Sequence, residues 1–120
     1  MMPQNYVVVT AHRSEFPQPI HFTKGAALTI GEQYQGPEDW DNWYFCTVEG
    51  LPGGWVPAQV IHWDRDGFGT ALEDYTAREL DVDPGDTLSG NRILNGWAWC
   101  HSSDGKAAGW VPLENLREAP

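Results

Sequence analysis

The tetrapeptide Gly-Trp-Val-Pro occurs twice, at residues 54–57 and again at 109–112. Two other blocks recur ahead of it in the same order. An aromatic stretch ending in cysteine occupies 43–46 and 97–100, and a short apolar stretch ending in glycine occupies 20–25 and 80–85. Three matched blocks in one order predict that the chain contains two copies of one structural unit.

The distance between the copies falls from 60 residues at the glycine block to 54 at the aromatic block. The first copy therefore carries extra residues between these two blocks. The repeat divides the 120 residues into units of about 50 to 60, which is near the lower limit for a domain that folds without staples. We expect each unit to depend on large aromatic side chains, and the chain contains seven tryptophans.

Stretches rich in β-branched and aromatic residues, separated by Gly and Pro, predict short strands and no substantial helix. In the first copy the expected strands are 6–10, 20–23, 27–34, 43–48 and 54–57, and in the second they are 70–75, 80–82, 87–94, 97–101 and 107–112. Five short strands fit a small, partly open barrel. We therefore predict an all-β fold of two tandem five-stranded barrels, with the first at 1–61, a linker at 62–69 and the second at 70–120.

The expected linker contains two aromatic residues, Trp63 and Phe68. Aromatic side chains are unusual in a solvated tether. We expect them to pack between the two barrels, although two exposed linker aromatics would also fit the sequence.

The formal net charge of −10, acidic in both halves, disfavours binding to nucleic acid or an anionic membrane. The sequence shows neither a signal peptide nor an apolar run of membrane-spanning length, so we expect a cytoplasmic protein. Cys46 and Cys100 follow bulky aromatics at equivalent positions and are expected in the two cores. The histidines lack metal-ligand spacing and no nucleophile or phosphate-binding motif is present, so we expect no metal, no cofactor and no enzymatic activity.

Several motifs resemble one known family. The Ala-Leu-Glu-Asp-Tyr sequence at 71–75 is similar to the Ala-Leu-Tyr-Asp-Tyr opening of Src-homology-3 domains. Residues 80–88 resemble the Leu-rich segment of that family, which carries a Gly-Asp pair. Trp97 stands at the first of its paired tryptophans, and residues 109–112 resemble its Gly-aromatic-aliphatic-Pro strand. The first copy resembles the family more loosely, in the same order, at 20–28, Trp43 and 54–57.

The resemblance implies binding of extended, proline-rich peptides in an aromatic groove. The implied groove residues are Tyr75, Trp97, Trp110 and Pro112 in the second copy, and Trp43, Trp55 and Pro57 in the first. In this family an acidic loop selects a basic ligand residue. The corresponding acids are Glu38, Asp39 and Asp41 in the first copy, and Glu73, Asp74 and Glu79 in the second.

The chain departs from the family at several groove positions. Val60 and Asn115 stand where the family has a tyrosine three residues after the groove proline, and Glu73 replaces the first opening tyrosine. In the first copy Thr10 and His12 stand near the two opening tyrosines. The pockets that hold the ligand prolines are thus incomplete in both copies.

Three functions remain open from the sequence. The aromatic surface would bind an extended segment of another protein, or it would pack against the sister barrel or another subunit in an assembly. A third reading is stacking of the aromatics on cell-wall carbohydrate, as the resemblance to some bacterial members of the fold implies.

Overall fold

The computed structural model describes residues 4–14, 18–34 and 42–119, and regular structure in these ranges consists of β-strands and two short 3-10 turns. The strands of the first half are β1 (Gln4–Val8), β2 (His21–Phe22), β3 (Ala27–Gln33), β4 (Trp43–Thr47), β5 (Gly54–Pro57) and β6 (Ile61–Arg65). Those of the second half are β7 (Phe68–Ala71), β8 (Tyr75–Thr76), β9 (Thr87–Leu94), β10 (Trp97–Ser102), β11 (Ala108–Pro112) and β12 (Leu116–Glu118). The 3-10 turns η1 (Ala58–Val60) and η2 (Leu113–Asn115) follow the two Gly-Trp-Val-Pro strands. The predicted all-β class is confirmed.

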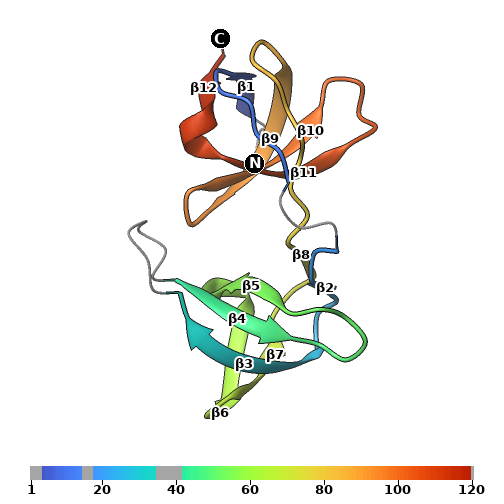
Figure 1. Cartoon of the computed structure of the whole chain (residues 1–120), viewed down its shortest axis with the longest axis vertical. Helices are drawn as coiled ribbons and strands as arrows, with labels where there is room; N and C mark the ends of the chain where they lie inside the picture. The colour runs from blue at the N-terminus through green and yellow to red at the C-terminus, as the bar shows by residue number, and fades with distance from the viewer. Residues whose placement is uncertain (1–3, 15–17, 35–41, 120) are drawn as a thin grey trace. The chain divides into compact units, whose positions relative to one another are not determined.

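The chain divides into two compact units, and these do not follow the boundaries that the repeat predicted. Unit 2 is continuous and runs from Gln18 to Ala77, whereas unit 1 combines Met1–Pro17 with Arg78–Pro120. Figure 1 shows this division directly, because the blue strand β1 lies in the same unit as the orange and red strands β9 to β12. Unit 2 is thus inserted into unit 1, and the division into 1–61 and 70–120 is corrected.

Unit 1 contains an antiparallel five-stranded sheet in the order β11-β10-β9-β1-β12. Strand β1 lies between β9 and β12, with Tyr6 opposite Leu88 on one side and Glu118 on the other. The order runs from an edge at β11 to an edge at β12, so the sheet is open rather than closed. The first strand of the chain is therefore an interior strand of the sheet formed by its last strands.

Unit 2 repeats this arrangement with the order β5-β4-β3-β7-β6, and a two-stranded sheet pairs β2 with β8. Here β7, between β3 and β6, takes the place that β1 has in unit 1. The hydrogen bonds match as well. In unit 1, Val8 forms two 2.9 Å backbone hydrogen bonds, one with Asp86 and one with Gly85. In unit 2, Ala71 forms two such bonds of 2.9 Å with Ala26 and Gly25, which lie 60 positions before Asp86 and Gly85 in the sequence. In each unit, the strand at this position therefore comes from the half of the sequence opposite to the one that the predicted repeat assigns to it.

The predicted linker at 62–69 is instead part of a β-hairpin, which corrects that expectation. Strands β6 and β7 pair antiparallel, with Ile61 opposite Ala71, and the chain turns at Asp66 and Gly67. The φ angle of Gly67 is 80°, in the left-handed region where glycine carries no steric penalty. This turn joins the last strand of the first copy directly to the first strand of the second.

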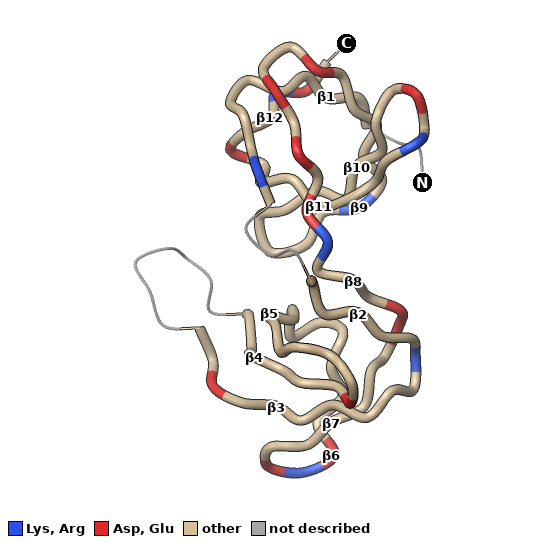
Figure 2. Tube along the Cα trace, turned by 45° about the vertical axis from the view of Figure 1, so that its right-hand side comes forward, with Lys and Arg blue, Asp and Glu red and all other residues tan. Residues whose placement is uncertain are grey.

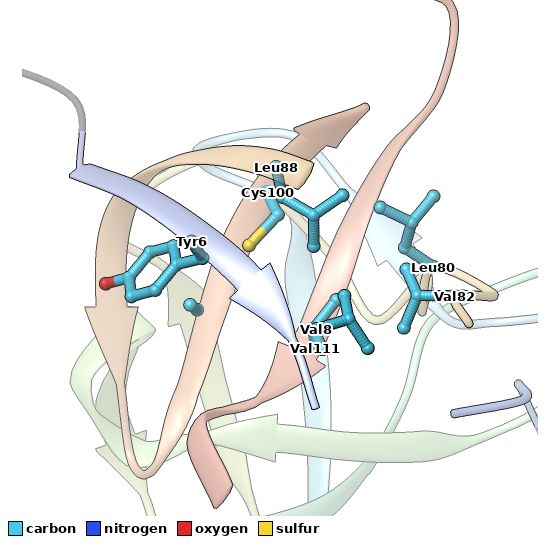
Figure 3. Packing of buried hydrophobic residues seen from close by; sticks show 8 residues of the cluster. Tyr6, Val8, Leu80, Val82, Leu88, Cys100 and Val111 are labelled. Carbon is cyan, nitrogen blue, oxygen red and sulfur yellow. The ribbon is translucent and has the colours of Figure 1, made fainter. Parts of the chain in front are cut away.

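The core of unit 1 is built from both ends of the chain. Figure 3 shows Tyr6 and Val8 of β1 packed among side chains from the later strands and from the segment that precedes β9. The buried cluster consists of Tyr6, Val8, Leu80, Val82, Leu88, Ala98, Cys100 and Val111. Since β1 contributes two of its large side chains, unit 1 cannot complete this core without the first strand.

The glycine of each Gly-Trp-Val-Pro motif allows a neighbouring segment to approach closely. A Cβ added at Gly109 would lie 2.7 Å from the backbone nitrogen of Leu80 and 2.8 Å from the carbonyl carbon of Glu79. At the equivalent Gly54 the nearest atom is Cγ2 of Ile20, at 2.8 Å. Ile20 and Leu80 are themselves equivalent in the repeat. The same contact therefore occurs in both units, against backbone in one and against a side chain in the other.

Candidate functional site

The residues predicted to form a groove are distributed over two units, and the structure groups them differently from the sequence. Tyr75 lies in unit 2, in β8, whereas the other residues assigned to its groove, Trp97, Trp110 and Pro112, lie in unit 1. Tyr75 is thus separated from the three residues predicted to share its groove, whereas Trp43, Trp55 and Pro57 all lie in unit 2. In unit 1 the corresponding position is taken by His12. His12 pairs with Val82, and Tyr75 pairs with Phe22, which lies 60 positions before Val82 in the sequence.

In unit 1, Trp97 and Pro112 lie directly opposite each other at the paired ends of β10 and β11. Both are partly exposed, while Trp110 is buried in the same sheet. Cross-strand neighbours on one sheet face lie close enough for their side chains to interact. The indole of Trp97 and the ring of Pro112 thus give unit 1 an accessible apolar surface.

A histidine–carboxylate pair lies beside this surface. His12 Nε2 is 2.6 Å from Glu79 Oε1, and the two side chains are only 16% and 11% exposed. The imidazole meets the indole of Trp97 edge to face, with the ring centroids 5.6 Å apart and an interplanar angle of 78°. The three side chains form a continuous cluster, which we call the Trp97 site: His12, Glu79 and Trp97, with Pro112 next to it.

Backbone pairing places both members of the histidine–carboxylate pair. His12 exchanges hydrogen bonds of 3.0 and 2.9 Å with Val82. Glu79 forms a parallel bridge with Trp110, whose nitrogen donates to the Arg78 carbonyl at 2.9 Å. The segment that carries Glu79 is therefore held against β11, and the segment that carries His12 is held against Val82, outside the sheet.

Asn115, which stands where the resemblance expects a groove tyrosine, has a structural role instead. It is buried, and its Nδ2 donates to the carbonyl oxygens of Thr10 at 3.2 Å and Ala11 at 3.1 Å. The backbone carbonyl of Asn115 accepts a 2.8 Å hydrogen bond from the backbone nitrogen of Val9. Because buried polar groups are costly unless they are hydrogen-bonded, Asn115 fixes the chain that leads from β1 to His12.

The equivalent surface of unit 2 is less accessible. Trp43 is only 7% exposed, Pro57 is fully buried and Tyr75 is buried against Phe22, with the ring centroids 5.6 Å apart. Trp55 is partly exposed and has edge-to-face contacts with the rings of Tyr34 and Phe45 at 5.2 and 5.4 Å. In unit 2 the accessible aromatic surface therefore surrounds Trp55 rather than Trp43.

The acidic residues expected to select a ligand are separated as well. Glu38, Asp39 and Asp41 lie outside the described residues. Glu73 and Asp74 belong to unit 2, where Asp74 Oδ1 accepts a 2.8 Å hydrogen bond from the Lys24 backbone nitrogen. Of the three acids that the structure describes, Glu79 is the one found in the Trp97 site.

Trp63 and Phe68, expected between the barrels, lie on the β6–β7 hairpin of unit 2 and are 40% and 45% exposed. Trp63 makes an edge-to-face contact with Tyr44 at 5.0 Å. The guanidinium carbon of Arg65 lies 4.6 Å from the centre of the Phe68 ring, which is a cation–π geometry. Both rings have partners within their own unit, so the expectation that they lie in a linker is wrong.

The two cysteines are free and buried, as the repeat predicted. Burial raises the pKa of Cys46 to about 12 and that of Cys100 to about 11, because the charged thiolate is poorly solvated there. Since the thiolate is the reactive form of cysteine, both side chains are chemically quiet at neutral pH. Among the described residues, no group of three His, Cys, Asp or Glu side chains is placed to hold a metal ion.

The buried thiols predict an alkaline limit to stability. The folded state holds these protons more tightly than the unfolded state, so stability should fall as pH rises from the ordinary thiol value of 9.0 towards 11 and 12.

At pH 8 a thiol reagent such as Ellman's should react slowly with the native protein and rapidly with two thiols in guanidinium chloride. Rapid reaction of two thiols in the native protein would contradict the burial of both cysteines.

Comparison of the chain with family models, with curated proteins and with solved structures finds no match. No helix in the described part of the chain is both long and apolar enough to cross a membrane.

Proposed function

We propose that the protein is a non-enzymatic interaction module whose two units are Src-homology-3-like, and that it binds an extended peptide segment at the Trp97 site of unit 1. The proposal rests mainly on one observation: a partly exposed indole flanked by Pro112 on its strand partner and by a histidine–carboxylate pair at its edge. The motif order, the 3-10 turn after each Gly-Trp-Val-Pro strand and the interior position of the first strand support the Src-homology-3-like assignment.

Unit 1 is the better candidate because ligand stacking needs an accessible ring. An extended, left-handed peptide is already ordered before it binds, so flat rings can hold its ridges at little entropic cost. Trp97 offers such a ring opposite a partly exposed proline, while the equivalent Trp43 and Pro57 of unit 2 are buried. Trp55 of unit 2 is partly exposed, but its ring lies against those of Tyr34 and Phe45. We therefore assign the binding site to one unit rather than to both.

The electrostatics of the chain favour a basic ligand. Figure 2 shows that Asp and Glu outnumber Lys and Arg along both units, in keeping with the net charge of −10. Opposite charge accelerates the encounter of a basic peptide with such a surface. At the site itself, a Lys or Arg of the ligand would compete with His12 for the carboxylate of Glu79.

Titration of the labelled protein with a basic proline-rich peptide tests this function. The indole signal of Trp97 is expected to shift on binding, and Trp97→Ala should weaken the interaction at least tenfold through loss of the stacking surface. Trp63→Ala is the matched control, since Trp63 is an exposed tryptophan of the other unit. Shifts that spare Trp97, or equal weakening by both substitutions, would contradict the assignment.

A second function, assembly with another subunit, is favoured by the exposed rings of the β6–β7 hairpin. Trp63 and Phe68 retain large exposed areas, and exposed aromatic patches often mark protein interfaces. Sedimentation of the wild type and of the Trp63→Ala/Phe68→Ala variant should show a smaller species for the variant if this surface associates. Identical sedimentation coefficients would exclude a role for the hairpin in assembly.

A further inference from the structure

The exchange of first strands raises the question of what selects each strand for its unit. The backbone pairings of β1 and β7 are interchangeable. Val7 lies opposite Thr87 in unit 1, and Thr70 lies opposite Ala27 in unit 2, at equivalent positions of the repeat. Hydrogen bonding of the backbone alone would therefore accept either strand in either unit.

Side chains that follow β1 make the distinction. His12 pairs with Glu79, and Arg13 pairs with Asp83 while its other nitrogen donates to the Val82 carbonyl at 2.7 Å. The backbone nitrogen of Ser14 donates to Asp81 Oδ1 at 2.7 Å. Two basic groups and a backbone donor thus face three carboxylates of unit 1.

Unit 2 offers no equivalent acids at these positions. Sixty residues before Glu79, Asp81 and Asp83 stand Pro19, His21 and Thr23. In the same way, the counterparts of His12 and Arg13 after β7 are Tyr75 and Thr76, which pair with Phe22 and His21. The segment 4–14 therefore matches unit 1 in charge and would leave its basic groups unpaired in unit 2.

The attachment of this segment is also long-range. Strand β1 pairs with β9 and β12, whose residues lie about 80 or more positions away, while the chain after Ser14 continues into unit 2. No tight turn of the chain therefore joins β1 to the strands with which it pairs in unit 1. The same segment from a second copy of the chain would present the same backbone bonds and the same basic groups.

From this geometry we infer that unit 1 is a strand-acceptor site selective for the segment 4–14, and that two copies of the chain exchange this segment at high protein concentration. Exchange of an identical element preserves every contact of the monomer and so forms a dimer at low cost. The acids Glu79, Asp81 and Asp83 select the donor. The inference depends on the strand pairing and does not require a peptide to bind at the Trp97 site, with which it shares the His12–Glu79 pair.

Two chains with one added cysteine each provide the test. Val7→Cys and Thr87→Cys chains are mixed at equal, high concentration, partly unfolded, refolded and mildly oxidised. Since each chain carries only one of the two positions, a disulfide between 7 and 87 forms only between chains. Tryptic peptides 1–13 and 79–92 should appear linked by mass spectrometry, and the yield should rise with protein concentration.

The matched control mixes Val7→Cys with Ala27→Cys, because residue 27 occupies in unit 2 the place of residue 87. At least fivefold more linkage to 87 than to 27 is expected. Absence of the 7–87 product at every concentration would overturn the exchange of segment 4–14 between two chains. Equal yields of linkage to 27 and to 87 would overturn the selectivity of unit 1 for this segment.

A further substitution separates charge selection from strand pairing. Glu79→Gln on the Thr87→Cys chain should lower the 7–87 yield several-fold, because the partner of His12 loses its charge. Glu114→Gln, an exposed acid of the same unit, should leave the yield unchanged. Equal yields for the two variants would overturn the role of the acids as selectors.

Discussion

Replacing Val8 by aspartate is expected to unfold unit 1 while unit 2 keeps its fold. Val8 is 1% exposed and belongs to the core cluster of unit 1. A carboxylate buried there without a partner costs several kcal/mol. A domain of this size, about 60 residues, has a total stability of only about 3 to 9 kcal/mol.

The seven tryptophans provide the readout, because their indole signals report on the two units separately. Trp97, Trp99 and Trp110 of unit 1 should lose chemical-shift dispersion in the Val8→Asp variant, and the indoles of unit 2 should retain it. Val7→Asp is the control on the same strand, since Val7 is only partly buried. Loss of the unit 2 signals instead would show that the first strand belongs to the first copy, against the exchange.

Replacing Gly109 by alanine is expected to destabilise unit 1 by about 3 kcal/mol, which is the upper range for inserting a methyl group into a packed site. The new Cβ would lie 2.7 Å from the nitrogen of Leu80 and 3.1 Å from the carbonyl oxygen of Arg78. These are backbone atoms, and the Arg78 carbonyl oxygen already accepts a hydrogen bond from the backbone nitrogen of Trp110. Relief of the clash therefore requires the segment that carries Glu79 to move.

Gly54→Ala is the matched comparison, because Gly54 is the equivalent residue of unit 2. Its Cβ would lie 2.8 Å from Cγ2 and 3.1 Å from Cβ of Ile20, while the Ile20 backbone nitrogen lies further away at 3.7 Å. A side chain can adjust at smaller cost, so we expect about 1 kcal/mol. Denaturant unfolding of both variants measures the difference. If Gly54→Ala lost as much unfolding free energy as Gly109→Ala, or more, the contact of Gly109 with backbone atoms would not be what determines the loss of stability.

Much of the fold could be predicted from the repeat. The strands around the Gly-Trp-Val-Pro motifs and the buried cysteines lie where the sequence predicts them. The exchange could not be predicted, because β1 and β7 pair in the same way with equivalent partners, and strand propensity does not distinguish between them. The hairpin turn at Asp66 and Gly67 lies in the expected linker, although an Asp-Gly pair between two strands is a strong hairpin signal.

The site could be predicted only in part. Motif positions singled out Trp97 and Pro112, which the structure places opposite each other. They also assigned Tyr75 to the same groove, although Tyr75 lies in the other unit. Once strands are exchanged, the residue beside Trp97 comes from the start of the chain. His12 carried a signal, since it stands where the first copy should have its opening tyrosine, yet its partner Glu79 is 67 residues away.

Contacts between strands measured by nuclear Overhauser effects test the exchange most directly. We expect cross-strand signals between Val7 and Thr87 and between Thr70 and Ala27. Signals between Val7 and Ala27, together with signals between Thr70 and Thr87, would show that each copy keeps its own first strand. That result would contradict the exchange and return Tyr75 to the unit that contains Trp97.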